Sequence, residues 1–259
     1  MRILLTGASR GIGRAIAERL AQPGSKLALC ASAPSRELDE VVAACEKLGA
    51  PTVGLTGNLR DPNTPAELVQ QAVSQLGGLD AVVSNAGIAE PGLLSELEDE
   101  SWDKIFAVNS RAPWLLARAA GPHLTATKGA FIAVASMSGV EPYPGTGAYS
   151  PSKAALIMTI RTLALEWAAK GARANTVSPG LFLSAMTAPI YADPEKKAAR
   201  EALIPMHRIG DPARDIAGLI AFLVSPDASY ITGQNILVDG GLIGSIHSQI
   251  AGRPKSGGA

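Results

Sequence analysis

Cysteines are scarce in this chain of 259 residues, which contains only Cys30 and Cys45. Cys30 lies in an apolar run and Cys45 in a segment of helical pattern, so we interpret both as small core residues rather than as a disulfide pair. The three histidines are scattered, and no metal-ligand spacing is visible. The sequence therefore predicts no metal site.

The chain also lacks an excess of charge of either sign and lacks a long apolar run. It has 23 basic and 23 acidic residues with no basic cluster, so a nucleic-acid backbone is not an expected partner. No apolar run is long enough to span a bilayer, and the apolar start at 1–5 is too short for a signal peptide. We expect a cytoplasmic protein that binds neither membranes nor nucleic acid.

Short apolar runs alternate with longer segments of helical periodicity. Strands are predicted at 2–6, 26–31, 52–56, 80–84, 130–136, 173–178 and 235–238. Helices are predicted at 11–21, 36–48, 65–76, 99–120, 149–170 and 212–225, the last with Asp211 as its cap and a proline at its first position. This alternation favours an α/β fold with a doubly wound parallel sheet of about seven strands and helices on both faces.

The alternation is broken only at 181–210, and no linker, repeat or low-complexity block divides the chain. The segment 181–210 follows the carboxyl end of a predicted strand, where such sheets bind their ligands. We interpret it as a substrate lid that is mobile without ligand; an ordinary surface insertion is the alternative. Residues 1–251 are predicted to form one domain, and 252–259 a flexible tail.

A glycine-rich turn, TGASRGIG at 6–13, follows the first predicted strand and opens the first predicted helix. Gly7 can adopt a positive φ, and Gly11 and Gly13 let the backbone approach a pyrophosphate closely. The helix start adds free N–H groups and the positive end of the helix dipole. The turn therefore predicts a dinucleotide site, to which Ser9, Arg10 and Ile12 also contribute.

Tyr149 and Lys153 are four residues apart on a predicted helix, and Ser136 precedes the tyrosine by thirteen residues. Residues at i and i+4 share a helix face, so the ammonium is expected to lower the phenol pKa from its usual value of about 10. Such a phenol can accept a proton from an alcohol or donate one to a carbonyl. Ser136 could hydrogen-bond the same oxygen. A surface helix with this spacing by chance is the alternative, but together with the glycine turn the pattern indicates hydride transfer.

The order and spacing of seven short motifs resemble the short-chain dehydrogenase/reductase family, closest to its ketoacyl-carrier-protein reductase-like members. The motifs are TGASRGIG at 6–13, SNAG at 84–87, FAVNS around Asn109, Ser136, YSPSK at 149–153, SPG at 178–180 and ITGQNILVDGG at 231–241. The resemblance covers nearly the whole chain. It implies a Rossmann-like dinucleotide-binding oxidoreductase domain in which Ser136, Tyr149 and Lys153 carry the reaction and Asn109 keeps a proton-relay water near the lysine.

Three positions depart from the family pattern. Ser84 replaces the first asparagine of N-N-A-G, Asn58 replaces an aspartate at the end of the third strand, and Ser184 replaces a threonine that bonds the nicotinamide amide. Ser184 keeps the hydroxyl group, and Asn58 could still bond the adenine edge. The other cofactor contacts that the resemblance implies are Ser32, Leu59, Asn85, Ala86, Gly87, Tyr149, Lys153, Pro179 and Gly180.

The second predicted strand ends without the acidic residue that would bind the ribose diol of NAD. Arg10 or Arg36 could instead pair with the 2′-phosphate of NADP. We therefore expect NADP, with NAD as the alternative. The expected substrate is a small molecule with a carbonyl or secondary alcohol group. An NAD-dependent alcohol or polyol dehydrogenase and a non-catalytic cofactor-binding protein stay open as alternatives.

The predicted helices at 99–120 and 149–170 carry more apolar residues than one sheet-facing stripe needs. Examples are Trp114, Leu115, Leu116, Ile157, Ile160, Leu163 and Trp167. An exposed apolar patch marks an interface, and the family resemblance implies a homotetramer that uses these helices. The alternative is that these residues pack only within one subunit.

Overall fold

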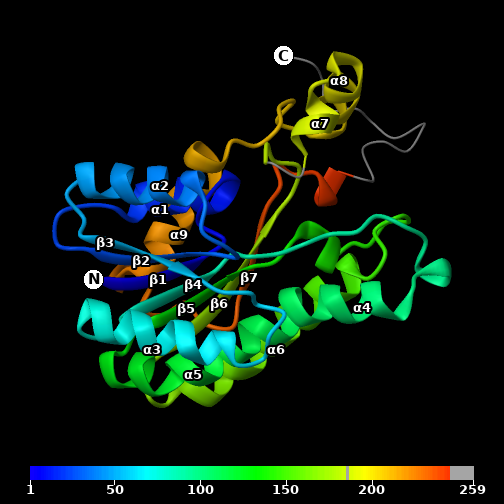
Figure 1. Ribbon diagram of the computed structural model, residues 1–259. Helices are drawn as coiled ribbons and strands as arrows, with labels where there is room; N and C mark the ends of the chain where they lie inside the picture. Colours follow the sequence, from blue (N-terminus) through cyan, green and yellow to red (C-terminus); the bar gives the residue numbers. More distant parts are fainter. Residues whose placement is uncertain (185–186, 246–259) are drawn as a thin grey trace.

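The computed structural model describes residues 1–184 and 187–245, which form a seven-stranded parallel sheet between two layers of helices (Figure 1). The strand order is β3-β2-β1-β4-β5-β6-β7, so the chain winds outward from the centre first on one side and then on the other. The strands are β1 (Arg2–Thr6), β2 (Lys26–Ala31), β3 (Thr52–Thr56), β4 (Ala81–Ser84), β5 (Ala130–Val134), β6 (Arg173–Pro179) and β7 (Asn235–Val238). The predicted Rossmann-like, doubly wound fold is confirmed.

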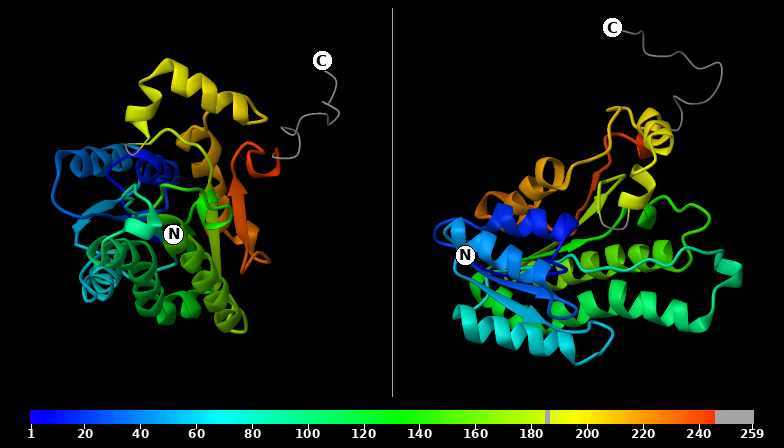
Figure 2. Two further views of the ribbon diagram at one scale, coloured as in Figure 1. Left: turned by 90° about the vertical axis from the view of Figure 1, so that its right-hand side faces the viewer. Right: turned by 45° about the horizontal axis from the view of Figure 1, so that its top comes forward.

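Three helices cover each face of the sheet (Figures 1 and 2). One layer contains α1 (Gly11–Leu20), α2 (Arg36–Lys47) and α9 (Ala217–Val224); the other contains α3 (Thr64–Leu76), α5 (Ala112–Thr127) and α6 (Tyr149–Ala168). Successive strand side chains point to opposite faces, so Ile3 and Leu5 join the first core while Leu4 joins the second. Burial on both faces explains why the strands are nearly continuous apolar runs.

Three further helices extend beyond the carboxyl ends of the strands: α4 (Asp99–Phe106), α7 (Ala188–Tyr191) and α8 (Pro194–Leu203) (Figure 1). The segment 181–210 contains α7 and α8, and its two ends are hydrogen-bonded to each other. There the amide of Gly210 donates to the carbonyl of Leu181 at 2.9 Å, and that of Leu183 donates to the carbonyl of Gly210 at 3.1 Å. The Phe182 ring packs over Gly210, where a β-carbon would lie 2.6 Å from it.

The predicted single helix at 99–120 is wrong. Here α4 ends at Phe106, a π-helical turn follows at Ala107–Arg111, and α5 continues to Thr127. A π turn adds one residue to a helix without breaking its course, and such turns are frequent at functional sites. Apolar periodicity cannot reveal a one-residue insertion, so the sequence showed one long helix. This turn carries Asn109.

Other boundaries also differ from the expectations. The predicted helix at 212–225 consists of a π-helical turn, Pro212–Ile216, followed by α9, and its predicted cap is confirmed because Asp211 Oδ1 accepts from the Arg214 amide at 2.8 Å. The strand predicted at 130–136 ends at Val134, and Ser136 caps a short 3₁₀ turn, Met137–Gly139. Two more 3₁₀ turns lie at Leu94–Glu96 and Pro226–Ala228.

In the ranges 1–184 and 187–245, no helix is long and apolar enough to cross a membrane. Within the same ranges no group of three or more histidine, cysteine or acidic side chains is arranged to hold a metal ion. The proposed tail at 252–259 lies outside the described residues.

Candidate active site

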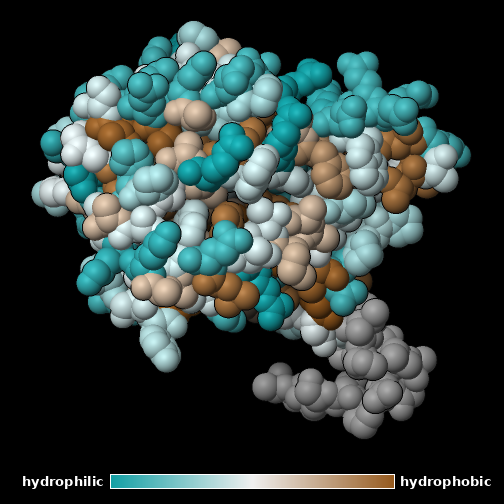
Figure 3. Space-filling view, turned by 90° about the horizontal axis from the view of Figure 1, so that it is seen from below, coloured by the Kyte–Doolittle hydropathy of each residue, from teal (hydrophilic) through white to brown (hydrophobic). Residues whose placement is uncertain are grey.

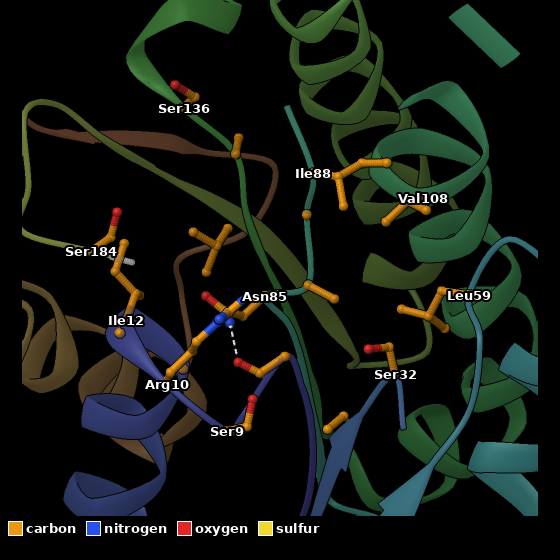
Figure 4. Close-up of a pocket in the computed structure, with 18 of the residues that line it drawn as sticks. Ser9, Arg10, Ile12, Ser32, Leu59, Asn85, Ile88, Val108, Ser136 and Ser184 are labelled. Atoms are coloured by element: carbon orange, nitrogen blue, oxygen red, sulfur yellow. Dashed lines mark hydrogen bonds between the residues drawn. The ribbon is translucent and has the colours of Figure 1, made fainter. Parts of the chain in front are cut away.

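A cavity of about 540 Å³ lies at the carboxyl edge of the sheet (Figure 4). The cofactor-binding and catalytic residues predicted from the sequence line it, except Asn109 and Arg36. In Figure 4, Ser9, Arg10 and Ile12 lie on one side of the cavity, Leu59, Ile88 and Val108 on the other, and Asn85 between them. The parallel strands bring these residues together because all of them end at this edge.

The glycine turn has the geometry of an anion site. Gly7 and Gly11 have φ values of +66° and +56°, and a β-carbon on Gly13 would lie 2.0 Å from the carbonyl oxygen of Gly7. The Asn85 amide group donates to the carbonyls of Thr6 and Gly7 at 3.2 and 3.0 Å, which fixes the turn. The start of α1 has no side-chain cap and no acidic residue in its first turn. These features fit the pyrophosphate of a dinucleotide.

Among the described lining residues, the charged side chains are all basic: Arg10, Arg60, Lys104 and Lys153. Arg10 lies at the wall with Ser32, where the sequence placed a candidate phosphate contact. Arg36 does not line the cavity, because its side chain is 90% exposed and pairs with Glu40 at 2.8 Å. Of the two arginines proposed for a 2′-phosphate, only Arg10 is therefore in place.

Tyr149, Lys153 and Ser136 meet at the other end of the cavity. The Lys153 Nζ lies 5.7 Å from the centroid of the Tyr149 ring and donates to the carbonyl of Val134 at 2.9 Å. Burial lowers the pKa of Lys153 to about 8. The Ser136 hydroxyl accepts from the amide and hydroxyl of Ser138 at 3.2 and 3.0 Å.

The expectation that Lys153 lowers the pKa of Tyr149 is wrong for the protein without ligand. Burial raises the pKa of the Tyr149 phenol, and the hydrogen bond with Ser136 offsets this only in part. The lysine is itself buried and donates to a backbone carbonyl, and its ammonium does not outweigh the effect of burial on the phenol. Tyr149 is therefore held as a neutral phenol, the form that donates a proton.

Asn109 is fully buried and does not line the cavity. Its Oδ1 accepts from the Ile88 amide at 2.9 Å, and its Nδ2 donates to the Ile88 carbonyl at 2.8 Å and to the Ser152 hydroxyl at 3.1 Å. A β-carbon on Gly87 would lie 3.3 Å from Lys153 Nζ and 3.4 Å from Asn109 Oδ1. The asparagine thus lies close to the lysine, but its amide group holds the backbone after β4.

The cavity is also lined by residues that the sequence did not indicate. They include Arg60, Ile88, Lys104 and Val108, whereas Phe182 and Thr187 belong to the segment predicted as a lid. Lys104 and Val108 are four residues apart on consecutive helical turns, and Arg60 and Ile88 follow predicted site residues, so spacing alone could have suggested them. Phe182 and Thr187 flank Ser184 in the segment 181–210.

The match to known proteins is extensive. A family model described as enoyl-(acyl carrier protein) reductase matches residues 7–243. The chain belongs to the short-chain dehydrogenase/reductase family. It resembles glucose 1-dehydrogenase of Gluconobacter oxydans, with 37% identity over 93% of this chain and 91% of the relative. It also resembles the 3-oxoacyl-(acyl-carrier-protein) reductase FabG of Staphylococcus aureus, with 35% identity over 92% of this chain and 96% of the relative.

Solved structures agree with this assignment. The RhlG/NADP active-site complex from Pseudomonas aeruginosa superposes with a TM-score of 0.85 and 30% identity, over 93% of this chain and 96% of that chain. The short-chain dehydrogenase/reductase described here is thus an oxidoreductase of a family that acts on alcohol and carbonyl groups.

The buried ammonium of Lys153 makes stability depend on pH. Its pKa of about 8 in the folded chain is below the value of about 10.4 for an unfolded lysine, so between these values the unfolded chain binds more protons. The free energy of unfolding should therefore rise by about 1–2 kcal/mol from pH 8 to pH 9.5, relative to Lys153→Met. Urea denaturation of both proteins at several pH values measures this. If the free energy of unfolding changed with pH equally in both proteins, the lowered pKa of Lys153 would be contradicted.

Proposed function

We propose that this protein is an NADP(H)-dependent oxidoreductase that transfers a hydride between the nicotinamide and a carbonyl or secondary alcohol. The observation that carries the proposal is a single cavity with an anion-binding glycine turn at one end and Ser136, Tyr149 and Lys153 at the other. This arrangement suits a dinucleotide whose phosphates bind the glycine turn and whose nicotinamide ring lies near Tyr149.

The nicotinamide, when bound, supplies or accepts the hydride at the substrate carbon. In reduction, Tyr149 donates its phenolic proton to the developing alkoxide oxygen, and Ser136 donates a hydrogen bond to the same oxygen. The raised pKa keeps the phenol protonated before the reaction. When Tyr149 gives up its proton, the ammonium of Lys153 beside the ring stabilises the negative charge of the phenolate that forms. The reverse sequence oxidises an alcohol.

The choice of NADP over NAD is supported by charge. The described cavity wall contains four basic side chains and no carboxylate, and a carboxylate near Ser32 would repel a 2′-phosphate. RhlG, which has a similar fold, is described as an active-site complex with NADP. Arg10 is the proposed partner of the 2′-phosphate, in line with its place beside the turn.

The substrate is proposed as a small ketone or secondary alcohol. Ile88 and Phe182 give the cavity apolar walls, which favours a substrate with an apolar body. One relative is named for glucose and another for an acyl-carrier-protein substrate, at nearly equal identity. A sugar or polyol is therefore the second candidate. The presence of Ser136, Tyr149 and Lys153 together in the cavity argues against a role limited to cofactor binding.

We also propose a homotetramer. Of the apolar residues singled out on these helices, Leu115, Leu116, Ile160 and Trp167 are buried in the subunit, so they cannot form an interface. Trp114 is exposed, and Trp102, Met158 and Leu165 on the same helices are exposed as well. Figure 3 shows the side of α3, α5 and α6, where hydrophobic side chains gather among polar ones. An uncovered apolar set of this kind favours association.

Replacement of Tyr149 by phenylalanine keeps the ring and removes the proton. We expect ketone reduction with NADPH to slow by about 10²–10⁴-fold, the usual range for general acid catalysis. Tyr230→Phe is the matched control because Tyr230 is fully exposed. A folded Tyr149→Phe variant with wild-type kcat would show that another group donates the proton.

Removal of the Arg10 guanidinium should weaken NADPH binding and leave NADH binding nearly unchanged. Loss of one charge-assisted hydrogen bond costs about 1.5–3 kcal/mol, so the Kd of NADPH should rise about 10- to 150-fold in Arg10→Ala. Arg36→Ala is the control, because its side chain points into solvent. Fluorescence titration measures both cofactors, and tighter binding of NADH by the wild type would reverse the preference.

The proposed tetramer has four chains of 26.6 kDa. Light scattering at micromolar concentration should give a mass of about 106 kDa. A Leu165→Glu variant, which puts a charge on the most exposed apolar side chain of α6, should reduce that mass. A wild-type mass of one chain would refute the proposal.

A further inference from the structure

The five residues 88–92 follow β4 and its SNAG motif, and they are hydrogen-bonded to the turn that precedes Tyr149. At one end, both backbone groups of Ile88 bond to the side-chain amide of Asn109. At the other end, the amide of Gly92 donates to the carbonyl of Gly145 at 3.0 Å, and the amide of Gly147 donates to the carbonyl of Gly92 at 2.9 Å. This segment, which we call the brace, therefore lies between the π turn and the start of α6.

The brace fits closely against the turn at 145–147. Gly147 has a φ of +54°, and a β-carbon there would lie 2.8 Å from the carbonyl oxygen of Glu90. The amide of Tyr149 donates to the carbonyl of Thr146 at 3.1 Å, so the same turn starts the helix of the proposed acid. A shift of the brace would therefore move the turn and, with it, Tyr149.

The middle of the brace is held by charge. The Glu90 carboxylate pairs with the ammonium of Lys104 on α4, and the two side chains are only 32% and 34% exposed. The hydrogen bond from Lys104 is the largest of the effects that lower the pKa of Glu90, followed by Ser101, with the charge of Arg60 contributing less. Lys104 and Arg60 line the cavity, whereas Glu90 does not.

We propose that the Glu90–Lys104 ion pair positions Tyr149 for proton transfer by fixing the brace to α4. The proposal rests on the proposed function. Neither residue exchanges a proton with the substrate: Glu90 acts through the turn at 145–147, and Lys104 acts through Glu90. The backbone bonds at Ile88 and Gly92 fix the ends, and the ion pair fixes the span between them.

The first test does not depend on activity. Glu90→Gln removes the charge but keeps the size of the side chain. The amides of Gly92 and Gly147 should then exchange hydrogen about two- to fivefold faster, while amides in α5 keep their rates. Glu18→Gln is the matched control, because it breaks an exposed pair with Arg14 on α1. Unchanged exchange at Gly92 and Gly147 would overturn the proposal.

The second test separates positioning from general destabilisation. With NADPH and a ketone that the wild type reduces, Glu90→Gln should lower kcat about tenfold and change the Kd of NADPH less than twofold. Lys104→Met should lower kcat by a similar factor. Lys104→Arg, which keeps the positive charge, should have a kcat close to that of the wild type. An equal kcat for wild type and Glu90→Gln would refute the role. A wild type that reduces no ketone would instead refute the proposed function, and hydrogen exchange would still decide whether the pair holds the brace.

Discussion

Parallel pairing of all seven strands is the constraint on which the site depends. Because the strands run in one direction, β1 to β6 all end at the same edge, and each is followed by residues that line the cavity. Residues as distant in sequence as Gly7 and Pro179 thus become neighbours around one volume. Burial of both sheet faces by helices keeps these strands in place. In open sheets of this kind, ligands bind beyond the carboxyl ends of the strands.

Charge divides this edge into distinct parts. The described cavity wall has only basic charged groups, and these attract a phosphorylated cofactor. Glu90 does not line the cavity, and its carboxylate is paired with Lys104. It therefore neutralises one cation without placing a negative charge in the wall of the cavity. Lys153 differs from the other three basic residues of the wall because burial lowers its pKa to about 8. Burial likewise raises the pKa of Tyr149, so its phenol is neutral in the protein without ligand.

The sequence predicted the strands, the glycine turn and the lining of the cavity well, because these depend on local patterns that sequence displays directly. It predicted less well whatever depends on three-dimensional surroundings. The π turn at 107–111 hides within continuous helical periodicity. Whether the pKa of Tyr149 is raised or lowered depends on its burial, which the spacing to Lys153 in the sequence does not reveal. Likewise, Leu116, Ile160 and Met158 are all apolar. Only the packing of the helices shows that Leu116 and Ile160 are buried and that Met158 is exposed. The lid's mobility and the site roles stay predictions.

Asn109 gives these observations a common basis. An extra residue in the π turn places its side chain where both backbone groups of Ile88 and the Ser152 hydroxyl can be bonded at once. Ser152 is next to Lys153 on α6, and Ile88 begins the brace that ends at the turn before Tyr149. The asparagine therefore reaches both members of the proposed proton-transfer pair through separate contacts. A rigid arrangement of donors requires no reorganisation during a reaction. We therefore expect this buried amide, which bonds to two elements, to support the proposed reaction without contacting the substrate. This accounts for a polar residue that is fully buried beside the cavity and yet does not line it.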